Sequence, residues 1–193
     1  MTKTAIALVL YTAGTAAYAG QPQPKVTVFV QNTANVPGDV FIPAEGLAGK
    51  MFARIGISLQ WRAGKSAGES SPRPIFIEFA METPDTLLPG ALAFARPYEG
   101  SQITVFFDRV KSSPHPGTVL AHVMVHEITH LLQGIARHSA TGIMKARWTT
   151  GDYRAMDYSP LPFTPEDVDL IHAGLAKRGG TEALSGSALA GRP

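Results

Sequence analysis

Hydrophobic and polar residues alternate over several short stretches of the chain, a pattern typical of half-buried β-strands. Residues 25–30 (KVTVFV) are also rich in β-branched side chains and predict the first strand. The same pattern predicts further strands at residues 57–62, 74–80, 91–96 and 102–110. Because the stretch 91–96 is short, we expect it to be an edge strand.

Three other stretches carry hydrophobic residues at the spacing of an α-helix. They cover residues 43–55, residues 118–133 with Thr118 as the N-cap, and residues 164–179. Residues 140–163 are rich in Gly, Pro and Tyr and predict a long loop. The order strand, helix, four strands, helix, loop, helix predicts the α+β class.

The first nineteen residues are arranged like a secretory signal peptide. Lys3 supplies a positive charge, residues 5–17 are apolar, and a small-x-small sequence ends at Ala19. The apolar run is shorter than the roughly 20 residues that span a bilayer. We therefore predict a signal peptide over residues 1–19, a protein without a membrane span, and a secreted or periplasmic location. The alternative is a hydrophobic N-terminal helix of the mature fold.

The composition fits one folded domain over residues 20–178, followed by a flexible tail over residues 179–193. With 45% hydrophobic residues and a formal net charge of +2, the chain is neither disordered nor suited electrostatically to nucleic acid. The absence of Cys excludes a disulfide scaffold, a thiolate metal ligand and a thiol nucleophile. A bound metal would need His or carboxylate ligands, and the sequence does not indicate an oligomeric state.

One motif carries clear chemistry. In His126-Glu127-Ile128-Thr129-His130, the two histidines stand one helical turn apart on the same face of the second predicted helix. Two imidazoles in that relation can bind one Zn²⁺ ion, and the intervening glutamate can serve as general base toward the metal-bound water. The alternative is a helix whose two histidines merely face solvent.

A catalytic zinc site needs a third protein ligand and an open fourth position. His138 is the next histidine along the chain. Gly134 lies between it and the predicted helix, and glycine can turn the chain sharply because it tolerates positive φ. Such a turn could bring His138 back toward the metal. The alternative is an exposed loop histidine.

The stretch HEITHLLQGIARHSATGIM resembles the metzincin clan of zinc endopeptidases, and within it the matrixin-like members. The resemblance implies that His126, His130 and His138 are zinc ligands and that Glu127 is the general base. It also implies that Met144 is the Met-turn residue beneath the metal. Over residues 25–178 the order of elements is similar to the metzincin fold. That fold has a mixed, twisted five-stranded sheet, an active-site helix and a small C-terminal subdomain ending in a helix.

The spacing departs from the family pattern. Metzincins have a glycine three residues after the second histidine and the third histidine three residues later, whereas both intervals are four here. The family's position for the third histidine is occupied by Ala136. Other third ligands therefore stay open, namely Asp152, Asp157 and Glu166.

Other residues near the motif support weaker hypotheses. His122 stands one turn before His126 and is interpreted as a buried, hydrogen-bonded residue or as one lying close to the metal. We interpret His115 and His172 as structural or exposed. Residues 91–97 resemble the edge strand that pairs with an extended substrate in metzincins. The wall of the specificity pocket is expected among Arg147, Trp148, Tyr153 and Tyr158, and a Tyr could donate to an oxyanion.

The sequence thus predicts an exported zinc-dependent endopeptidase that acts on a protein or peptide. Two alternatives remain: a zinc hydrolase of a non-peptide amide, as in cell-wall material, and a catalytically silent metzincin-like binding protein. Retention of Glu127 disfavours the silent protein, because turnover needs this residue and zinc binding does not.

Overall fold

The computed structural model describes residues 23–64, 73–87, 89–98 and 101–189, and for residues 180–189 the backbone alone. The predicted signal peptide lies outside these residues. The elements are β1 (Lys25–Gln31), α1 (Gly38–Ala53), β2 (Ser58–Ala63), β3 (Ile75–Ala80), β4 (Ala93–Ala95), β5 (Gln102–Phe106), α2 (Phe107–Val110), α3 (Pro116–Gln133), α4 (Thr150–Tyr158) and α5 (Pro165–Leu189). Within the described ranges, no helix has the length and hydropathy of a membrane span.

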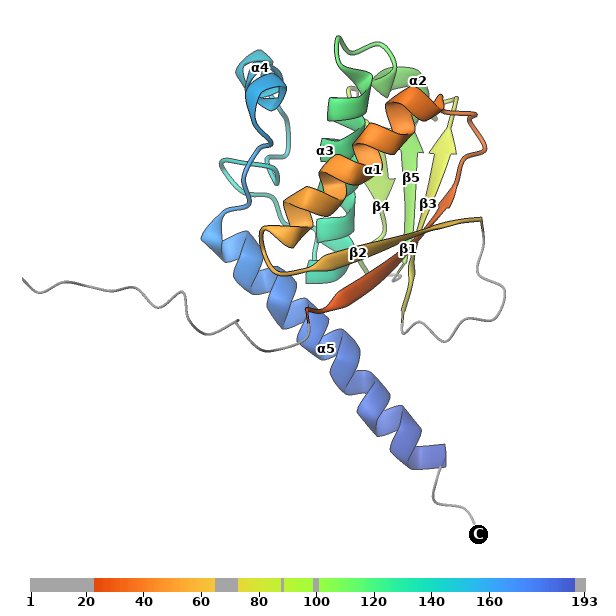
Figure 1. Ribbon diagram of the computed structural model, residues 1–193, viewed down its shortest axis with the longest axis vertical. Coiled ribbons are helices and arrows are strands. Elements are labelled where there is room, and N and C mark those ends of the chain that lie inside the picture. The colour runs from red at the N-terminus through yellow and green to blue at the C-terminus, as the bar shows by residue number, and fades with distance from the viewer. Residues whose placement is uncertain (1–22, 65–72, 88, 99–100, 190–193) are drawn as a thin grey trace, which may run out of the picture.

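The strands form one five-stranded sheet in the order β2-β1-β3-β5-β4. The first four strands of that order are parallel, and β4 pairs with β5 antiparallel at one edge. Figure 1 shows the sheet strongly twisted, with β2 and β1 turned away from the direction of β5. This arrangement confirms the predicted mixed α+β sheet and the edge position of its short strand.

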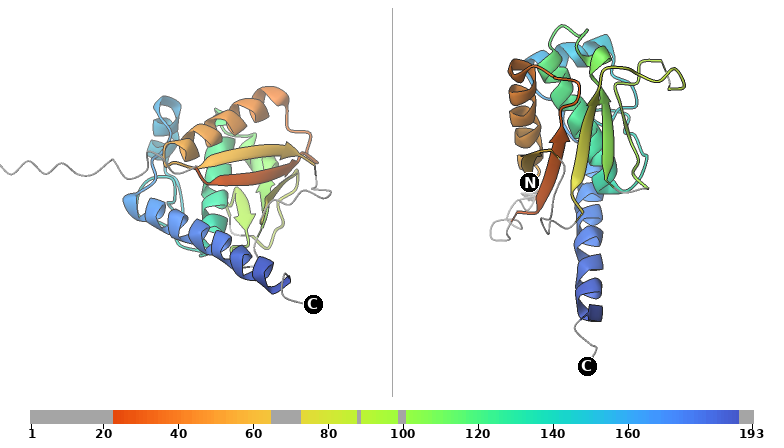
Figure 2. Two further views of the ribbon diagram at one scale, coloured as in Figure 1. Left: turned by 60° about the horizontal axis from the view of Figure 1, so that its bottom comes forward. Right: turned by 90° about the vertical axis from the view of Figure 1, so that its right-hand side faces the viewer.

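Helices α1 and α3 pack against one face of the sheet, as the edge-on view in Figure 2 shows. Alternate residues of the central strands point toward these helices, and Val28, Ile75 and Ile77 are at most 1% exposed. Nearly every residue of α3 from Val119 onward is buried. Because α3 is enclosed on so many sides, its side chains have little freedom to move.

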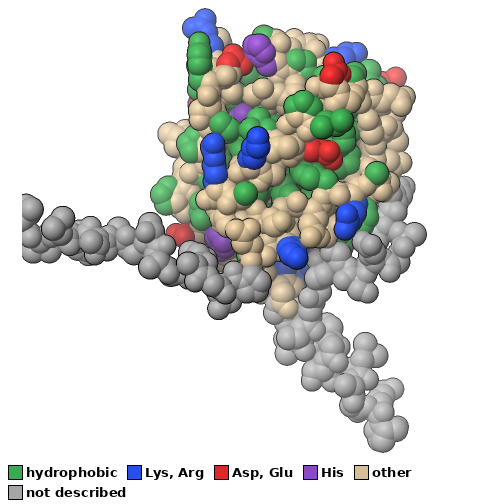
Figure 3. All heavy atoms as spheres, viewed as in Figure 1, with side chains coloured by type: hydrophobic (Ala, Val, Ile, Leu, Met, Phe, Trp, Pro, Cys, Tyr) green, Lys and Arg blue, Asp and Glu red, His purple; other side chains and the backbone are tan. Residues whose placement is uncertain are grey.

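Helix α5 packs across the C-terminal end of α3. A Cβ atom at Gly174 would lie 1.8 Å from the carbonyl oxygen of Leu132, so the two backbones touch directly. Arg178 donates to the carbonyl of Leu131 at 3.2 Å. Figure 1 shows the second half of α5 extending away from the rest of the molecule. On the face shown in Figure 3, the coloured cationic and acidic side chains are scattered among apolar ones.

Two predicted segments are wrong in part. The strand expected over residues 102–110 ends at Phe106, because Phe107 and Val110 are both buried at helical spacing and form α2. The loop expected over residues 140–163 contains α4. Its first turn is stabilised by a capping box between Thr149 and Asp152.

Three helix ends also differ from the prediction. Helix α1 begins at Gly38, so Pro43 lies inside it rather than near its start, and the helix tolerates the missing N–H. Helix α3 begins at Pro116 with His115 as N-cap, so Thr118 is not the cap. Helix α5 continues past Gly179-Gly180 to Leu189, because glycines weaken a helix without ending it.

Candidate metal centre

Helix α3 places His126 and His130 side by side. Their Nε2 atoms are 3.1 Å apart, and the two residues are 9% and 6% exposed. The helix ends at Gly134, which has a left-handed φ of 69° and whose N–H donates to the carbonyl of His130. Two imidazole nitrogens therefore point to one place beside the last turns of a rigid helix.

Hydrogen bonds fix the orientation of both rings. Nδ1 of His126 donates to the carbonyl of Ile143 at 2.9 Å, and Nδ1 of His130 donates to the carbonyl of Ile135 at 3.2 Å. A carbonyl oxygen only accepts, so in each neutral ring the proton is on Nδ1 and Nε2 carries the free lone pair. This is the usual arrangement of metal-binding histidines.

His138 completes a three-histidine cluster. One ring nitrogen from each of His126, His130 and His138 lies within 4.8 Å of the others, and His138 is exposed where the other two are buried. Its ring centroid is 5.3 Å from that of His126 and 5.0 Å from that of His130. The longer loop thus brings the third histidine to the cluster in spite of its unusual spacing.

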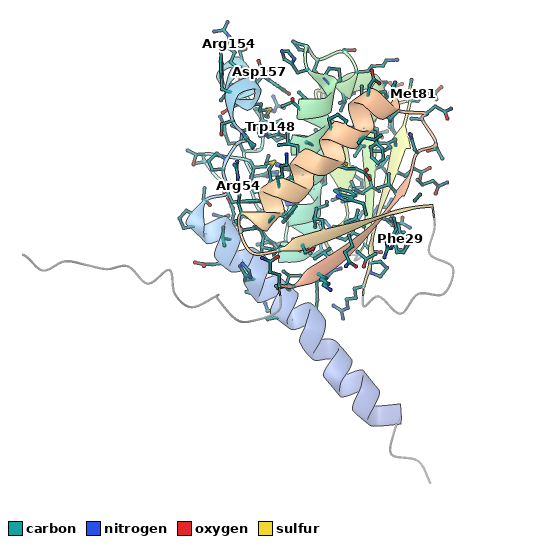
Figure 4. All side chains as sticks on the ribbon, in the orientation of Figure 1. Phe29, Arg54, Met81, Trp148, Arg154 and Asp157 are labelled. Atoms are coloured by element: carbon teal, nitrogen blue, oxygen red, sulfur yellow. The ribbon has the colours of Figure 1, made fainter. Side chains whose placement is uncertain are left out.

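The rival carboxylates make other contacts. Asp152 forms an ion pair with Lys145 and caps α4. Asp157 lies on α4, at the periphery of the molecule (Figure 4), 3.5 Å from a ring nitrogen of His115. Glu166 pairs with Arg137. In the part of the chain that the structure describes, none of the three joins the histidine cluster.

Burial keeps the cluster neutral. It lowers the pKa of His126 to about 3, with a further contribution from the charge of His130. Burial and the charge of His138 lower the pKa of His130 to about 4, and burial lowers the pKa of His138. Since neutral imidazole is the form that binds metal, all three side chains are ready for coordination at neutral pH.

Glu127 lies between the two buried histidines in the sequence and lines the same cleft. Burial raises the pKa of its carboxyl to about 7, although a hydrogen bond from the backbone of Ala95 on β4 acts in the opposite direction. A carboxyl group with a pKa near neutrality can both accept and return a proton.

A tight turn over residues 142–145 lies next to the cluster. Gly142 has a φ of +74°, and a Cβ atom there would be 2.3 Å from the carbonyl oxygen of Pro162. The N–H of Ile143 donates to that same oxygen at 2.9 Å. Met144 is fully buried, and its carbonyl accepts from the N–H of Ser139 at 2.7 Å. The turn is therefore joined both to His126 and to the loop that carries His138.

A cleft of about 630 Å³ runs between β4 and the residues after the turn, with the histidine cluster in its wall. Trp148 and Tyr153 line it, and their ring centroids are 6.2 Å apart. Trp148, labelled in Figure 4, lies 5.8 Å from the ring centroid of His126. Arg147 also lines the cleft, whereas Tyr158 is 91% exposed and does not. Of the predicted wall residues, the structure therefore brings all but Tyr158 to the cleft.

The remaining histidines have structural contacts. His122 is fully buried; its Nδ1 donates to Thr118 at 2.7 Å, and its Nε2 accepts from Leu161 at 3.1 Å. His172 bonds the carbonyl of Ile55; His115 occupies the N-cap position of α3, where its carbonyl accepts from the N–H of Val119 while its side chain is exposed. These contacts agree with the structural interpretation of all three.

Sequence reasoning missed Asp167, a fully buried carboxylate beside the loop that carries His138. It accepts hydrogen bonds from Ser139 at 2.6 Å and Arg137 at 3.1 Å. Burial raises the pKa of Asp167, but these bonds and those from Thr164 outweigh it, so the net pKa is below the ordinary value. The pattern Thr164-x-x-Asp167 marks the helix start in the sequence but gives no sign of the contact with the loop.

No family model matches the sequence, and no curated protein is significantly similar to it. Solved structures that resemble the fold include two archaemetzincins. An archaemetzincin from Methanopyrus kandleri has a TM-score of 0.55 and 13% identity, with 82% of this chain and 99% of that chain covered. An archaemetzincin from Archaeoglobus fulgidus, complexed with malonate, has a TM-score of 0.47 and 12% identity, with 75% and 99% covered. The likeness to the Methanopyrus kandleri protein confirms a metzincin-like α+β fold.

Proposed function

We propose that this protein is an exported zinc-dependent endopeptidase that hydrolyses peptide bonds with water. The observation that carries the proposal is the three-histidine cluster in the wall of an open cleft, with Glu127 beside it. The fold likeness to an archaemetzincin supports it. A matrixin-like specificity is supported by the resemblance of the sequence motif alone.

The donor set fits zinc. Three neutral imidazole nitrogens with an open side are the ligands of a catalytic Zn²⁺ site, and the exposed position of His138 leaves that side toward the cleft. When bound there, Zn²⁺ polarises a carbonyl and lowers the pKa of a coordinated water to about 7. His126, His130 and His138 would hold the ion, and Met144 would pack beneath it.

Glu127 would move the protons. The backbone N–H of Ala95 holds its carboxyl group at the cleft, and burial brings its pKa to about 7. The carboxylate would take a proton from the attacking water and pass it to the leaving nitrogen of the substrate. A pKa close to the ambient pH suits a group that must first accept a proton and then donate it.

The edge of the sheet would bind the substrate. Strand β4 pairs only with β5 among the described strands and lines the cleft. An extended peptide could add to its free side through main-chain hydrogen bonds. Tyr153 is placed along the same cleft and could donate a hydrogen bond to the developing oxyanion.

Export rests on the sequence of residues 1–19. N-terminal sequencing of protein recovered from the culture medium or periplasm tests it, and we expect a mature chain that begins at Gly20. Recovery of the intact Met1 terminus from the cytoplasm alone would contradict it.

The activity is tested by incubating zinc-loaded protein with casein and with a peptide library. We expect cleavage that a chelator abolishes and that Glu127→Ala reduces at least about 100-fold while zinc stays bound. Glu82→Ala is the matched control, because Glu82 is exposed and outside the cleft.

The other outcomes separate the alternatives. Activity that survives Glu127→Ala would overturn the mechanism. Zinc-loaded protein that cleaves no peptide, but releases amide products from cell-wall material, would point to a non-peptide hydrolase. Zinc binding without either activity would indicate a silent binding protein.

A further inference from the structure

Both sequence neighbours of His138 are tied to one side chain on another helix. The Oγ of Ser139 donates to Asp167 at 2.6 Å, and Nη1 of Arg137 donates to the same carboxylate oxygen at 3.1 Å. Arg137 also donates to Ser139 at 3.2 Å. Asp167 lies in the first turn of α5, so the loop that carries His138 is fastened to that helix.

Asp167 is itself held firmly in place. Its second carboxylate oxygen accepts from the N–H of Thr164 at 3.0 Å and from the Thr164 hydroxyl at 2.7 Å. Its own N–H donates back to that hydroxyl at 3.2 Å, which completes a capping box. The side chain of Gln133, at the end of α3, donates to the carbonyl of Asp167 at 3.3 Å. The carboxylate is thus a fixed point between α3 and α5.

His138 differs from its two partners in the cluster. Hydrogen bonds to carbonyls orient the rings of His126 and His130, whereas within the described residues the ring of His138 makes none. It is also exposed, and it lies on the loop that follows α3 after Gly134. The position of this ring must therefore come from the backbone on either side of it.

We propose that Asp167 is a positioning residue that holds His138 in reach of the metal through Arg137 and Ser139. The inference rests on the proposed function, since it takes the three-histidine cluster to bind zinc. Loss of the carboxylate frees both neighbours of His138 without removing any of the three imidazoles. The ion would then keep His126 and His130 as rigid ligands, and His138 would no longer be held in a fixed position.

The test compares Asp167→Asn with Asp169→Asn in the full chain. Asp169 is on the same helix, two residues after Asp167, and its side chain is exposed. Zinc affinity is measured by competition with a chromophoric chelator, and the geometry of the site by the visible absorption of the Co²⁺-substituted protein. We expect Asp167→Asn to weaken zinc binding about tenfold or more and to change the Co²⁺ spectrum. Asp169→Asn should leave both unchanged.

A merely structural role predicts a different result. The metal-free and zinc-loaded forms of Asp167→Asn would then lose thermal stability equally, with zinc affinity and Co²⁺ spectrum unchanged, and the inference would be overturned. Should Asp167→Asn fail to fold, Ser139→Ala removes one of the two ties and is expected to weaken zinc binding by a smaller factor. Unchanged affinity in that variant would also overturn the inference.

Failure of the proposed function gives a separate result. If the wild-type protein binds no zinc, the metal site itself is wrong. If the wild type and Asp169→Asn bind zinc and Asp167→Asn binds it equally well, the site stands and only the role of Asp167 is rejected.

Discussion

The carbonyl of Ile143 accepts a hydrogen bond from Nδ1 of His126 at 2.9 Å. Ile143 belongs to the tight turn that follows the loop of His138, and its carbonyl also accepts from the indole N–H of Trp148 at 3.2 Å. The turn therefore orients one histidine of the cluster and one aromatic residue of the cleft together. Changes in the turn should act on the metal site although no residue of the turn is among the three histidines.

Gly142→Ala tests this relation. The substitution places a side chain at φ +74° and within 2.3 Å of the carbonyl oxygen of Pro162, so the turn must shift. We expect a loss of at least about 2 kcal/mol in the free energy of unfolding, measured with denaturant, together with weaker zinc binding. Gly56→Ala is the control, because Gly56 has a similar φ of +78° but open space around it. It should lose stability only, by about 1 kcal/mol.

Gly174→Ala tests the contact between α5 and α3. Its Cβ atom would lie 1.8 Å from the carbonyl oxygen of Leu132, so α5 would have to move away from α3. We expect the free energy of unfolding to fall by about 2 kcal/mol or more. Gly46→Ala, in α1 with no atom near its Cβ position, should instead raise it by about 0.5–1 kcal/mol. Equal effects of the two substitutions would contradict the close approach.

Zinc retention should extend to unusually low pH. Protons compete with zinc for imidazole, and an ordinary histidine becomes protonated below about pH 6.5. The pKa values of about 3 for His126 and about 4 for His130 move this competition to lower pH. Dialysis over a pH series, followed by metal analysis, should show zinc retained at pH 5.5. Release with a midpoint near pH 6.5 would contradict the expectation.

Asp167 should stabilise the metal-free fold in a pH-dependent manner. Its pKa is lowered in the folded state, so the charged form favours folding above the unfolded value of about 3.9. This contribution is lost as the pH falls from about 4 through the folded pKa. Asp167→Asn should be less stable than the wild type at pH 6, and the difference should shrink below pH 4. Urea unfolding at both pH values measures it, and a constant difference would be inconsistent with the charge.

The features that could be predicted from the sequence are those set by local spacing. His126 and His130 stand four residues apart, and any helix through them brings the rings together. The alternation in β3 was also predictable, because Ile75, Ile77 and Phe79 are buried while the residues between them are not. The third histidine was inferred from its nearness in sequence and from the resemblance.

The features that were missed depend on distant partners or on polar signals. Ser139 bonds Asp167 across 28 residues, and no periodicity in either segment encodes that pairing. The close approach of Gly174 to Leu132 likewise appears only when α5 is folded onto α3. Helix α4 has few buried residues, so its hydrophobic pattern is weak, and the capping box at Thr149 was its clearest sign.

The uneven burial of the cluster has a consequence for metal exchange. His126 and His130 are enclosed by α3 and the turn, whereas His138 faces solvent on a loop. A bound ion would therefore enter and leave from the His138 side, with detachment of that single imidazole as the first step of release. The rate at which a chelator removes the ion would then be set by how often His138 detaches, while His126 and His130 keep their positions on α3.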